Sequence, residues 1–247
     1  MDFSLYLLIF FISIIQSIAG VGILVLGTPI MLILNYSILQ TMFFLLPMSI
    51  IISFSNLILI NCFFKMKEKI DFKLIKYFFI FCFPSVCIGL IIMKNFNELI
   101  NFNVLVSIII FFSIIIKIRY ERFFLNLKRN SRKIIIFFIG IIHGLTNSGG
   151  TLLSLFILRK DKKEINTSRL KIHLFYFFLA TTQLIVLYFF LGNQFKYNIN
   201  LYLVFLIIIF SCLIGNRVVK TFKGLSSYLI YILAIISSIV LFIKGII

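Results

Sequence analysis

Long apolar runs alternate with short polar or basic stretches along the whole chain. No Asp, Glu, Lys or Arg occurs from Phe3 to Phe64, and about 20 consecutive apolar residues suffice to cross a bilayer. The apolar windows between charged positions give these segments: 3–34, 38–64, 77–93, 99–116, 134–158, 172–192, 199–216 and 225–243. Because lipid cannot satisfy open backbone groups, the segments predict helices. We therefore predict an all-α polytopic membrane protein, with a single integral membrane domain over residues 1–247.

Two of the segments carry helix-breaking residues near their centres. Segment 3–34 would form about 48 Å of helix, longer than a hydrocarbon core of about 30 Å, and its middle reads QSIAGVGILVLGTP. The middle of segment 134–158 reads TNSGGT, at residues 146–151. Glycine and proline interrupt helices, although small residues in spans also serve helix packing or produce a kink. We predict a broken or re-entrant helix in each segment.

The charged residues constrain how the segments cross the membrane. Four stretches are basic, namely 65–76, 117–133, 159–171 and 217–223, and the positive-inside rule places all four in the cytoplasm. Only segment 134–158 separates the second stretch from the third, so both lie on one side if that segment enters the membrane and returns. Each half of it would be about 18 Å long, which is enough to pass the bilayer midplane.

An internal repeat relates the two interrupted segments. AGVGILVLGTPI aligns with TNSGGTLLSLFI, so that Gly22 and Gly149 are 127 residues apart, and the same spacing separates Asn56 from Gln183. The chain is predicted to divide into repeat A over 3–117, a cytoplasmic linker over 118–133 and repeat B over 134–247. Each repeat would hold one broken or re-entrant helix and three spanning helices. Because three is odd, the two pseudo-symmetric repeats would be inverted, as in many transporters.

A broken helix has chemistry of its own. The N–H groups at the start of its second half and the helix dipole favour an anion. In the second repeat, Asn147 or Ser148 is expected to cap a helix over 151–158. In the first repeat, Thr28 is expected to cap the second half with Pro29 at its first position, and the alternative opening lies at Gly20–Gly22.

The candidate substrate-binding residues come from the two interruptions and the two matched amide-bearing spans. They are Gln16, Gly20, Gly22, Thr28, Asn56, Thr146, Asn147, Ser148, Gly149, Gly150, Thr151 and Gln183. For Asn56 and Gln183, hydrogen bonding between helices is the alternative. For His143, one turn before the second interruption, a structural role is favoured over a ligand or proton role.

The charge balance limits which binding partners the sequence predicts. The net charge is +17, but the cations lie in short loops between spans, so we expect a lipid bilayer rather than nucleic acid as their partner. No charged residue is predicted in mid-span, which argues against proton-relay carboxylates and favours a small anion. We find no catalytic motif and expect neither an enzyme nor a cofactor or metal. A homo-oligomer is left open.

Four stretches together resemble the sulfite exporter TauE/SafE family of membrane permeases. They are QSIAGVGILVLGTPIMLIL, KEKIDFKLIKYFF, IGIIHGLTNSGGTLLSLFIL and CLIGNRVVKTF, in the family's order and over nearly the whole chain. The resemblance implies a multi-pass permease of a bacterial inner membrane for small anions, often sulfur oxyanions or organosulfonates such as sulfite. The family's glycine-rich breaks match Gly20–Pro29 and Gly144–Thr151, and its amide-bearing second span matches Asn56. The shorter glycine runs here and the missing proline after the second break leave the substrate open.

These observations predict a secondary transporter. The anion would bind near the midplane at the two interruptions, and the repeats would rock to expose it to each side in turn. An anion channel is one alternative, because nothing in the sequence fixes gating. A non-transporting membrane scaffold or assembly protein is another.

Overall fold

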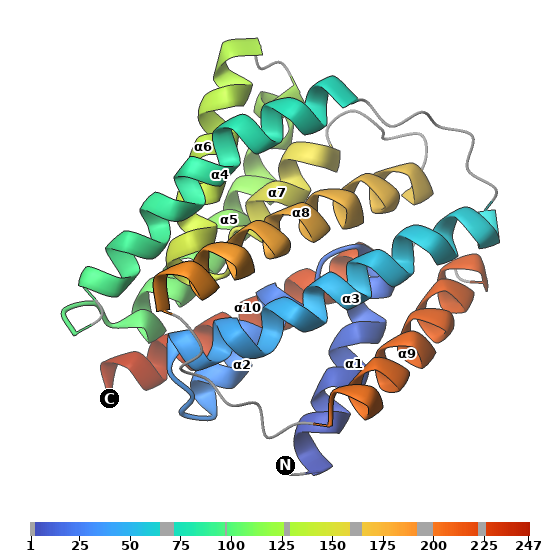
Figure 1. Ribbon diagram of the computed structural model, residues 1–247, viewed down its shortest axis with the longest axis horizontal. Coiled ribbons are helices and arrows are strands. Elements are labelled where there is room, and N and C mark those ends of the chain that lie inside the picture. The colour runs from blue at the N-terminus through green and yellow to red at the C-terminus, as the bar shows by residue number, and fades with distance from the viewer. Residues whose placement is uncertain are drawn as a thin grey trace.

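A computed structural model describes residues 3–64, 72–96, 98–125, 129–158, 165–191, 200–221 and 226–247. The regular elements in these ranges are all helices (Figure 1). In chain order they are α1 Phe3–Ala19, α2 Ile23–Ile33, α3 Ile38–Phe64, α4 Phe72–Asn95, α5 Phe102–Leu125, α6 Arg129–Thr146, α7 Gly150–Leu158, α8 Ile165–Leu191, α9 Leu201–Thr221 and α10 Ser226–Ile246. The prediction of an all-α protein is confirmed for the described part of the chain.

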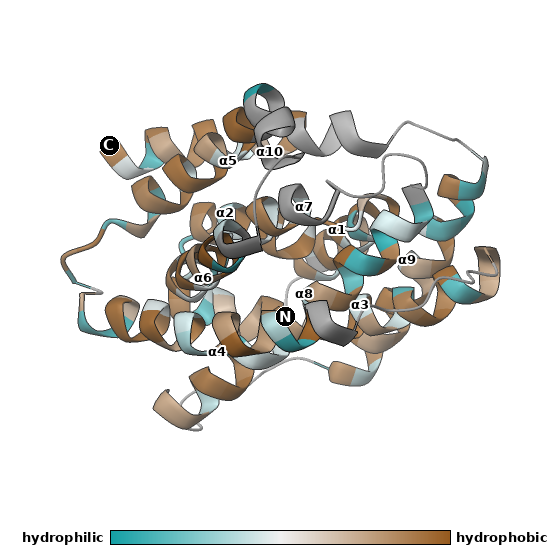
Figure 2. Cartoon of the chain, turned by 90° about the horizontal axis from the view of Figure 1, so that it is seen from above, coloured by the Kyte–Doolittle hydropathy of each residue, from teal (hydrophilic) through white to brown (hydrophobic). Residues whose placement is uncertain are grey.

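The distribution of side chains is that of a membrane protein. Four described helical stretches are long and apolar enough to cross a membrane: Ile38–Phe64, Ile75–Asn95, Asn166–Phe190 and Leu201–Thr221. Figure 2 shows the helices mainly in the hydrophobic colour. Large apolar side chains such as that of Phe189, 83 % exposed, cover the outside, while amide side chains are buried inside. This arrangement suits a lipid solvent and not water.

The predicted segments agree with the helices at their centres and differ at their basic ends. Segment 38–64 coincides with α3, and segments 3–34 and 134–158 each divide into two helices. Elsewhere the helices extend into stretches predicted as loops: α5 continues to Leu125, and α8 begins at Ile165. The expectation of a basic loop over 117–133 is wrong for the residues up to Leu125 and from 129 onward, which are helical. Lys and Arg are good helix formers, and their long stems let a helix continue to the membrane interface.

The helices pair across the two halves of the chain. α3 packs along α8, α5 along α10, α1 on α9 and α4 on α6. In Figure 1, α3 and α8 lie side by side and run in opposite directions. A Cβ atom at Gly144 would collide with the carbonyl oxygen of Val86, so α6 approaches α4 this closely only because a glycine is there.

The two interrupted helices enter the molecule from opposite edges. In Figure 1 the edge of the molecule that faces the lower left holds the start of α1, at the bottom of the view, and the end of α2. The edge that faces the upper right holds the start of α6, at the top of the view, and the end of α7. α4 and α8 also begin at this edge, and α9 ends there, toward the right of the view. Each interrupted pair therefore forms a hairpin with its turn inside the molecule, and the two turns bring four helix ends into the interior.

Candidate functional site

The first break, residues 20–22, lies between α1 and α2. Gly20 has a φ of +80°, a conformation that favours glycine, and its N–H donates to the carbonyl oxygen of Gln16 at 2.7 Å. The Gln16 side chain then turns over the start of α2, where its Oε1 accepts from the N–H of Ile23 at 2.8 Å. The Nε2 of Gln16 donates to Ser53 Oγ at 3.3 Å. The opening of α2 is thus closed by a side chain of the preceding helix.

The alternative opening predicted at Gly20–Gly22 is confirmed, and the helix start at Thr28 is wrong. Thr28 and Pro29 both lie inside α2, six and seven positions after Gly22. The helix starts earlier because Gln16 supplies the acceptor that the first backbone N–H of α2 requires.

The second break, residues 147–149, repeats this backbone geometry. Asn147 has a φ of +62°, and its N–H donates to the carbonyl oxygen of His143 at 2.7 Å. α7 begins directly afterwards, at Gly150. A Cβ atom at Gly149 would lie 2.7 Å from both the Cβ of His143 and the carbonyl oxygen of Ile139. Gly149 therefore fits here only because it has no side chain.

The predicted cap of α7 does not form. The Nδ2 of Asn147 donates instead to Thr28 Oγ1 at 3.1 Å, and Ser148 Oγ donates to the carbonyl oxygen of Thr146 at 3.2 Å. The first bond connects the second break to the interior of α2, and Thr28 lies in this contact and not at a helix start. The hydroxyls of Thr146 and Thr151 donate to backbone oxygens of Ile142 and Ser148, so local bonds also use these predicted donors.

The two matched amides lie in different surroundings. Gln183 Nε2 donates to the carbonyl oxygen of His143 at 3.2 Å and lies 3.5 Å from Met42 Sδ, which places Gln183 beside the second break. Asn56 belongs to a separate polar cluster near the first break. Its Nδ2 donates to Ser17 Oγ at 3.0 Å, and its Oδ1 accepts from Asn216 at 2.8 Å.

Arg169 completes that cluster, and sequence reasoning missed it. It was assigned to the basic stretch 159–171, but it lies in α8 with a side chain only 2 % exposed. The guanidinium donates to Asn216 Oδ1 at 2.9 Å and to the carbonyl oxygen of Ser17. A periodic signal was available: four polar residues of α8 share one helical face, a set that we call the polar stripe. Its members are Arg169, His173, Tyr176 and Gln183.

Buried polar atoms without a hydrogen-bond partner gather around these features. Among the described residues they are Ser13 Oγ, Ser49 Oγ, both ring nitrogens of His143, Asn147 Oδ1, Arg169 Nε, both ring nitrogens of His173, Tyr176 Oη and Gln183 Oε1. Each such atom costs about 1–3 kcal/mol of unfolding free energy. Native proteins leave few of them, and a cluster calls for an explanation such as a ligand site.

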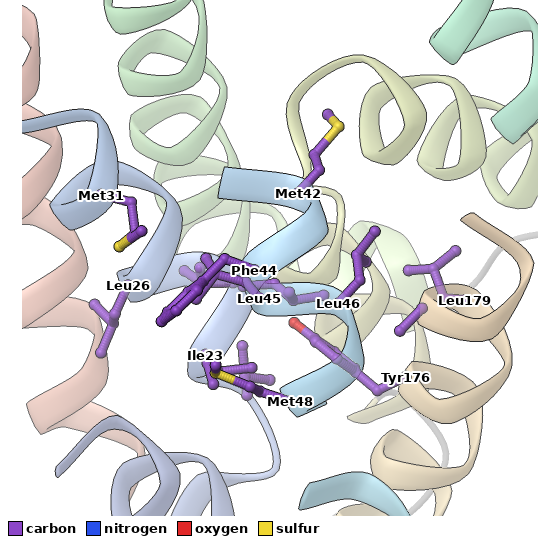
Figure 3. Close-up of a cluster of buried hydrophobic side chains, with 14 of the residues drawn as sticks. Ile23, Leu26, Met31, Met42, Phe44, Leu45, Leu46, Met48, Tyr176 and Leu179 are labelled. Atoms are coloured by element: carbon purple, nitrogen blue, oxygen red, sulfur yellow. The ribbon is translucent and has the colours of Figure 1, made fainter. Parts of the chain in front are cut away.

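The Tyr176 hydroxyl shows how the cluster meets the second break. A Cβ atom at Gly150 would collide with this hydroxyl, so it lies against the first residue of α7. Figure 3 shows the Tyr176 ring leaving α8 and its oxygen pointing among the apolar side chains of α2 and α3. The start of α7, Tyr176 and His143 therefore border one region whose polar atoms lack partners.

The chemistry of this region suits an anion. It offers N–H and O–H donors and the positive end of the nine-residue helix α7. The Arg169 guanidinium lies nearer the beginning of α8. Among the described side chains, no carboxylate is buried, and no group of three or more His, Cys, Asp or Glu is placed to hold a metal ion.

Two interrupted helices with their turns inside an apolar helical bundle are typical of a membrane transporter. A family model described as sulfite exporter TauE/SafE matches residues 5–242, which is nearly the whole chain. The chain belongs to this family and is, as a member, a membrane permease. The resemblance found in the sequence is thereby confirmed. Comparison with curated proteins and with solved structures found no match.

Proposed function

We propose that the protein is a secondary transporter for a small anion, a sulfur oxyanion or an organosulfonate such as sulfite. One observation carries the proposal: unpartnered polar atoms and a helix start converge at the second break, which is hydrogen-bonded to α2. None of these atoms belongs to a carboxylate, and the Tyr176 hydroxyl and one ring nitrogen of His143 can donate, which favours a negatively charged ligand. The anion would lie against the start of α7, near His143, Tyr176 and Gln183.

The predicted binding residues would divide between two roles. Gly149, Gly150 and Gln183 border the proposed site itself, whereas Gln16, Gly20 and Gly22 shape the first break, and Thr28 bonds to Asn147 from within α2. Asn56 would contribute through the cluster with Arg169. Thr146, Ser148 and Thr151 would support the turn, because their hydroxyls donate locally.

Inverted repeats would provide the alternating access. Two observations support them: α8 begins at Ile165 and α3 at Ile38, a difference of 127, and both helices have 27 residues. The packing also exchanges partners as an inverted repeat requires, because α1 lies on α9 as α6 lies on α4. Rocking of one half against the other would expose the two breaks to each side in turn.

The charges favour one orientation. Basic residues stand at the helix ends of one edge, including Lys76 at the start of α4 and Lys220 at the end of α9. By the positive-inside rule that edge would be cytoplasmic, and the protein would lie in the inner membrane.

The test is uptake of sulfite, sulfate, thiosulfate and ethanesulfonate into liposomes that contain the purified protein. We expect saturable uptake of at least one of these anions, lost in Gly149→Leu and retained in the lipid-facing control Phe189→Leu. A conductance that rises without saturation would indicate an anion channel instead. Absence of both uptake and binding, with Gly149→Leu tolerated, would indicate a scaffold.

A further inference from the structure

The polar stripe of α8 passes both breaks. At its beginning, Arg169 donates to the carbonyl oxygen of Ser17, three residues before the first break. A Cβ atom at Gly20 would lie 3.2 Å from Cγ2 of Ile172, so the first break packs on α8 at this level. About 10 Å farther along α8, Tyr176 lies against the start of α7. Gln183 follows seven residues after Tyr176, beside the second break.

Arg169 is a buried cation whose described partners are all neutral. Its Nη atoms donate to Asn166 Oδ1 at 3.1 Å, to Asn216 Oδ1 at 2.9 Å and to the carbonyl oxygen of Ser17. The guanidinium carbon also lies 5.9 Å from the centre of the Phe64 ring. These contacts orient the charge but do not neutralise it, and a buried charge is costly unless it is paired.

Unpartnered polar atoms follow one another along a single face of α8. Nε of Arg169 has no partner, and both ring nitrogens of His173, one helical turn farther along the same face, have none either. The stripe therefore offers unpartnered polar atoms from Arg169 through His173 to Tyr176, without interruption by a partnered polar residue.

The corresponding place in the other half carries no charge. The residue 127 positions before Arg169 is Met42, a buried apolar side chain that lies beside Gln183. If Arg169 served only to anchor α8 to its neighbours, a similar residue would be expected at the corresponding place in the other half.

We propose that Arg169, assisted by His173, forms a second anion station at the beginning of α8, separate from the site at the second break. The anion pairs with the guanidinium there and moves along the stripe to Tyr176 and the start of α7. This inference rests on the proposed transport function. It assigns to Arg169 the preference for anions and the dependence of their affinity on the charge they carry.

The test compares anions of different charge. Inhibition constants of methanesulfonate, a monoanion, and thiosulfate, a dianion, are measured against sulfite uptake into phosphatidylcholine liposomes. Because a Coulomb energy scales with the charge of the ligand, Arg169→Gln should raise the constant about tenfold for methanesulfonate and about a hundredfold for thiosulfate. Arg169→Lys keeps the charge, so the ratio of the two constants should stay near that of the wild type.

His173→Phe supplies a variant that leaves every contact of Arg169 in place. It should raise both constants about threefold and equally, because it removes neutral partners only. If Arg169→Gln does not fold, His173→Phe decides the question: unchanged constants in this variant would overturn the proposal. Equal rises for both anions in Arg169→Gln would likewise reduce Arg169 to a helix clamp.

The controls separate this inference from the transport function. A wild type that neither carries sulfite nor is inhibited by either anion contradicts the proposed function itself. Normal wild-type uptake with unaltered constants in Arg169→Gln contradicts only the second station. A charge effect that appears in liposomes containing phosphatidylglycerol and not in pure phosphatidylcholine would assign Arg169 to a lipid headgroup, which also overturns the proposal.

Discussion

The two breaks have the same backbone conformation and differ in the side chains that surround it. At each, a residue with positive φ donates its N–H to the carbonyl oxygen four residues earlier, and a helix begins three residues later. In the first break that earlier residue is Gln16, whose side chain caps α2 at Ile23. In the second it is His143, whose two ring nitrogens have no partner.

The difference indicates which break is built to receive a ligand. A side-chain oxygen of the protein already accepts from the first N–H of α2, so Gln16 occupies the start of that helix. The second break presents the start of α7 beside unpartnered atoms of His143 and Tyr176. The common backbone thus provides the turn, and the side chains decide between closing it and leaving it for an anion.

The largest effect is expected from adding a side chain at the second break. Gly149→Ala places a Cβ atom 2.7 Å from both a backbone oxygen and the Cβ of His143, so the turn cannot keep its shape. Transport should fall below detection. Gly22→Ala, which meets the backbone nitrogen of Gln16 at 2.8 Å, should be comparably damaging if both turns are needed. Uptake assays on the two variants check this, and full activity of either would contradict the account.

Gln16 and His143 occupy corresponding positions in the two breaks, and exchanging them should give each break the properties of the other. His143→Gln gives α7 the acceptor that α2 has, so anion affinity should fall about tenfold while thermal stability rises. Gln16→His removes the cap of α2 and should cost about 1–2 kcal/mol of unfolding free energy. Binding titrations and thermal unfolding measure both effects. Equal anion affinity in His143→Gln and the wild type would mean that the second break does not hold the anion.

A smaller effect is expected at the hydroxyl of Tyr176. Because this group has no partner in the protein, Tyr176→Phe should leave stability unchanged or raise it, while KM for the anion rises about fivefold. Tyr188→Phe, on an exposed side chain of the same helix, is the matched control and should change neither quantity. Loss of stability in Tyr176→Phe would indicate a structural hydroxyl.

The smallest effect concerns the bond between the second break and α2. Thr28→Val keeps the shape of the side chain but removes the acceptor of Asn147 Nδ2, which should cost about 1 kcal/mol. A double-mutant cycle with Asn147→Ala isolates the pair. A coupling energy near zero would show that α2 does not support the second break through this contact.

The sequence predicted features that depend on local pattern. The ends of α3 follow from an uninterrupted apolar run, and both breaks follow from glycine spacing within segments too long or too polar to be simple spans. The family, confirmed over residues 5–242, follows from the order of these short motifs.

Features that depend on distant partners were not predictable in this way. Asn147 was a reasonable cap for α7, but its side chain bonds to Thr28, 119 residues away in sequence. Arg169 looked like a loop cation because basic residues surround it. Contacts with Ser17 in α1 and Asn216 in α9 hold it inside the molecule, and no sequence window contains all three.

The central claim is that the second break holds a small anion, and thermal unfolding of the purified protein with added anions tests it most directly. Sulfite, sulfate, thiosulfate and ethanesulfonate would be compared in the wild type and in His143→Gln. The account predicts an upward shift of Tm that is selective among these anions in the wild type and is reduced in the variant. Equal shifts in both proteins, or no shift with any anion, would contradict it.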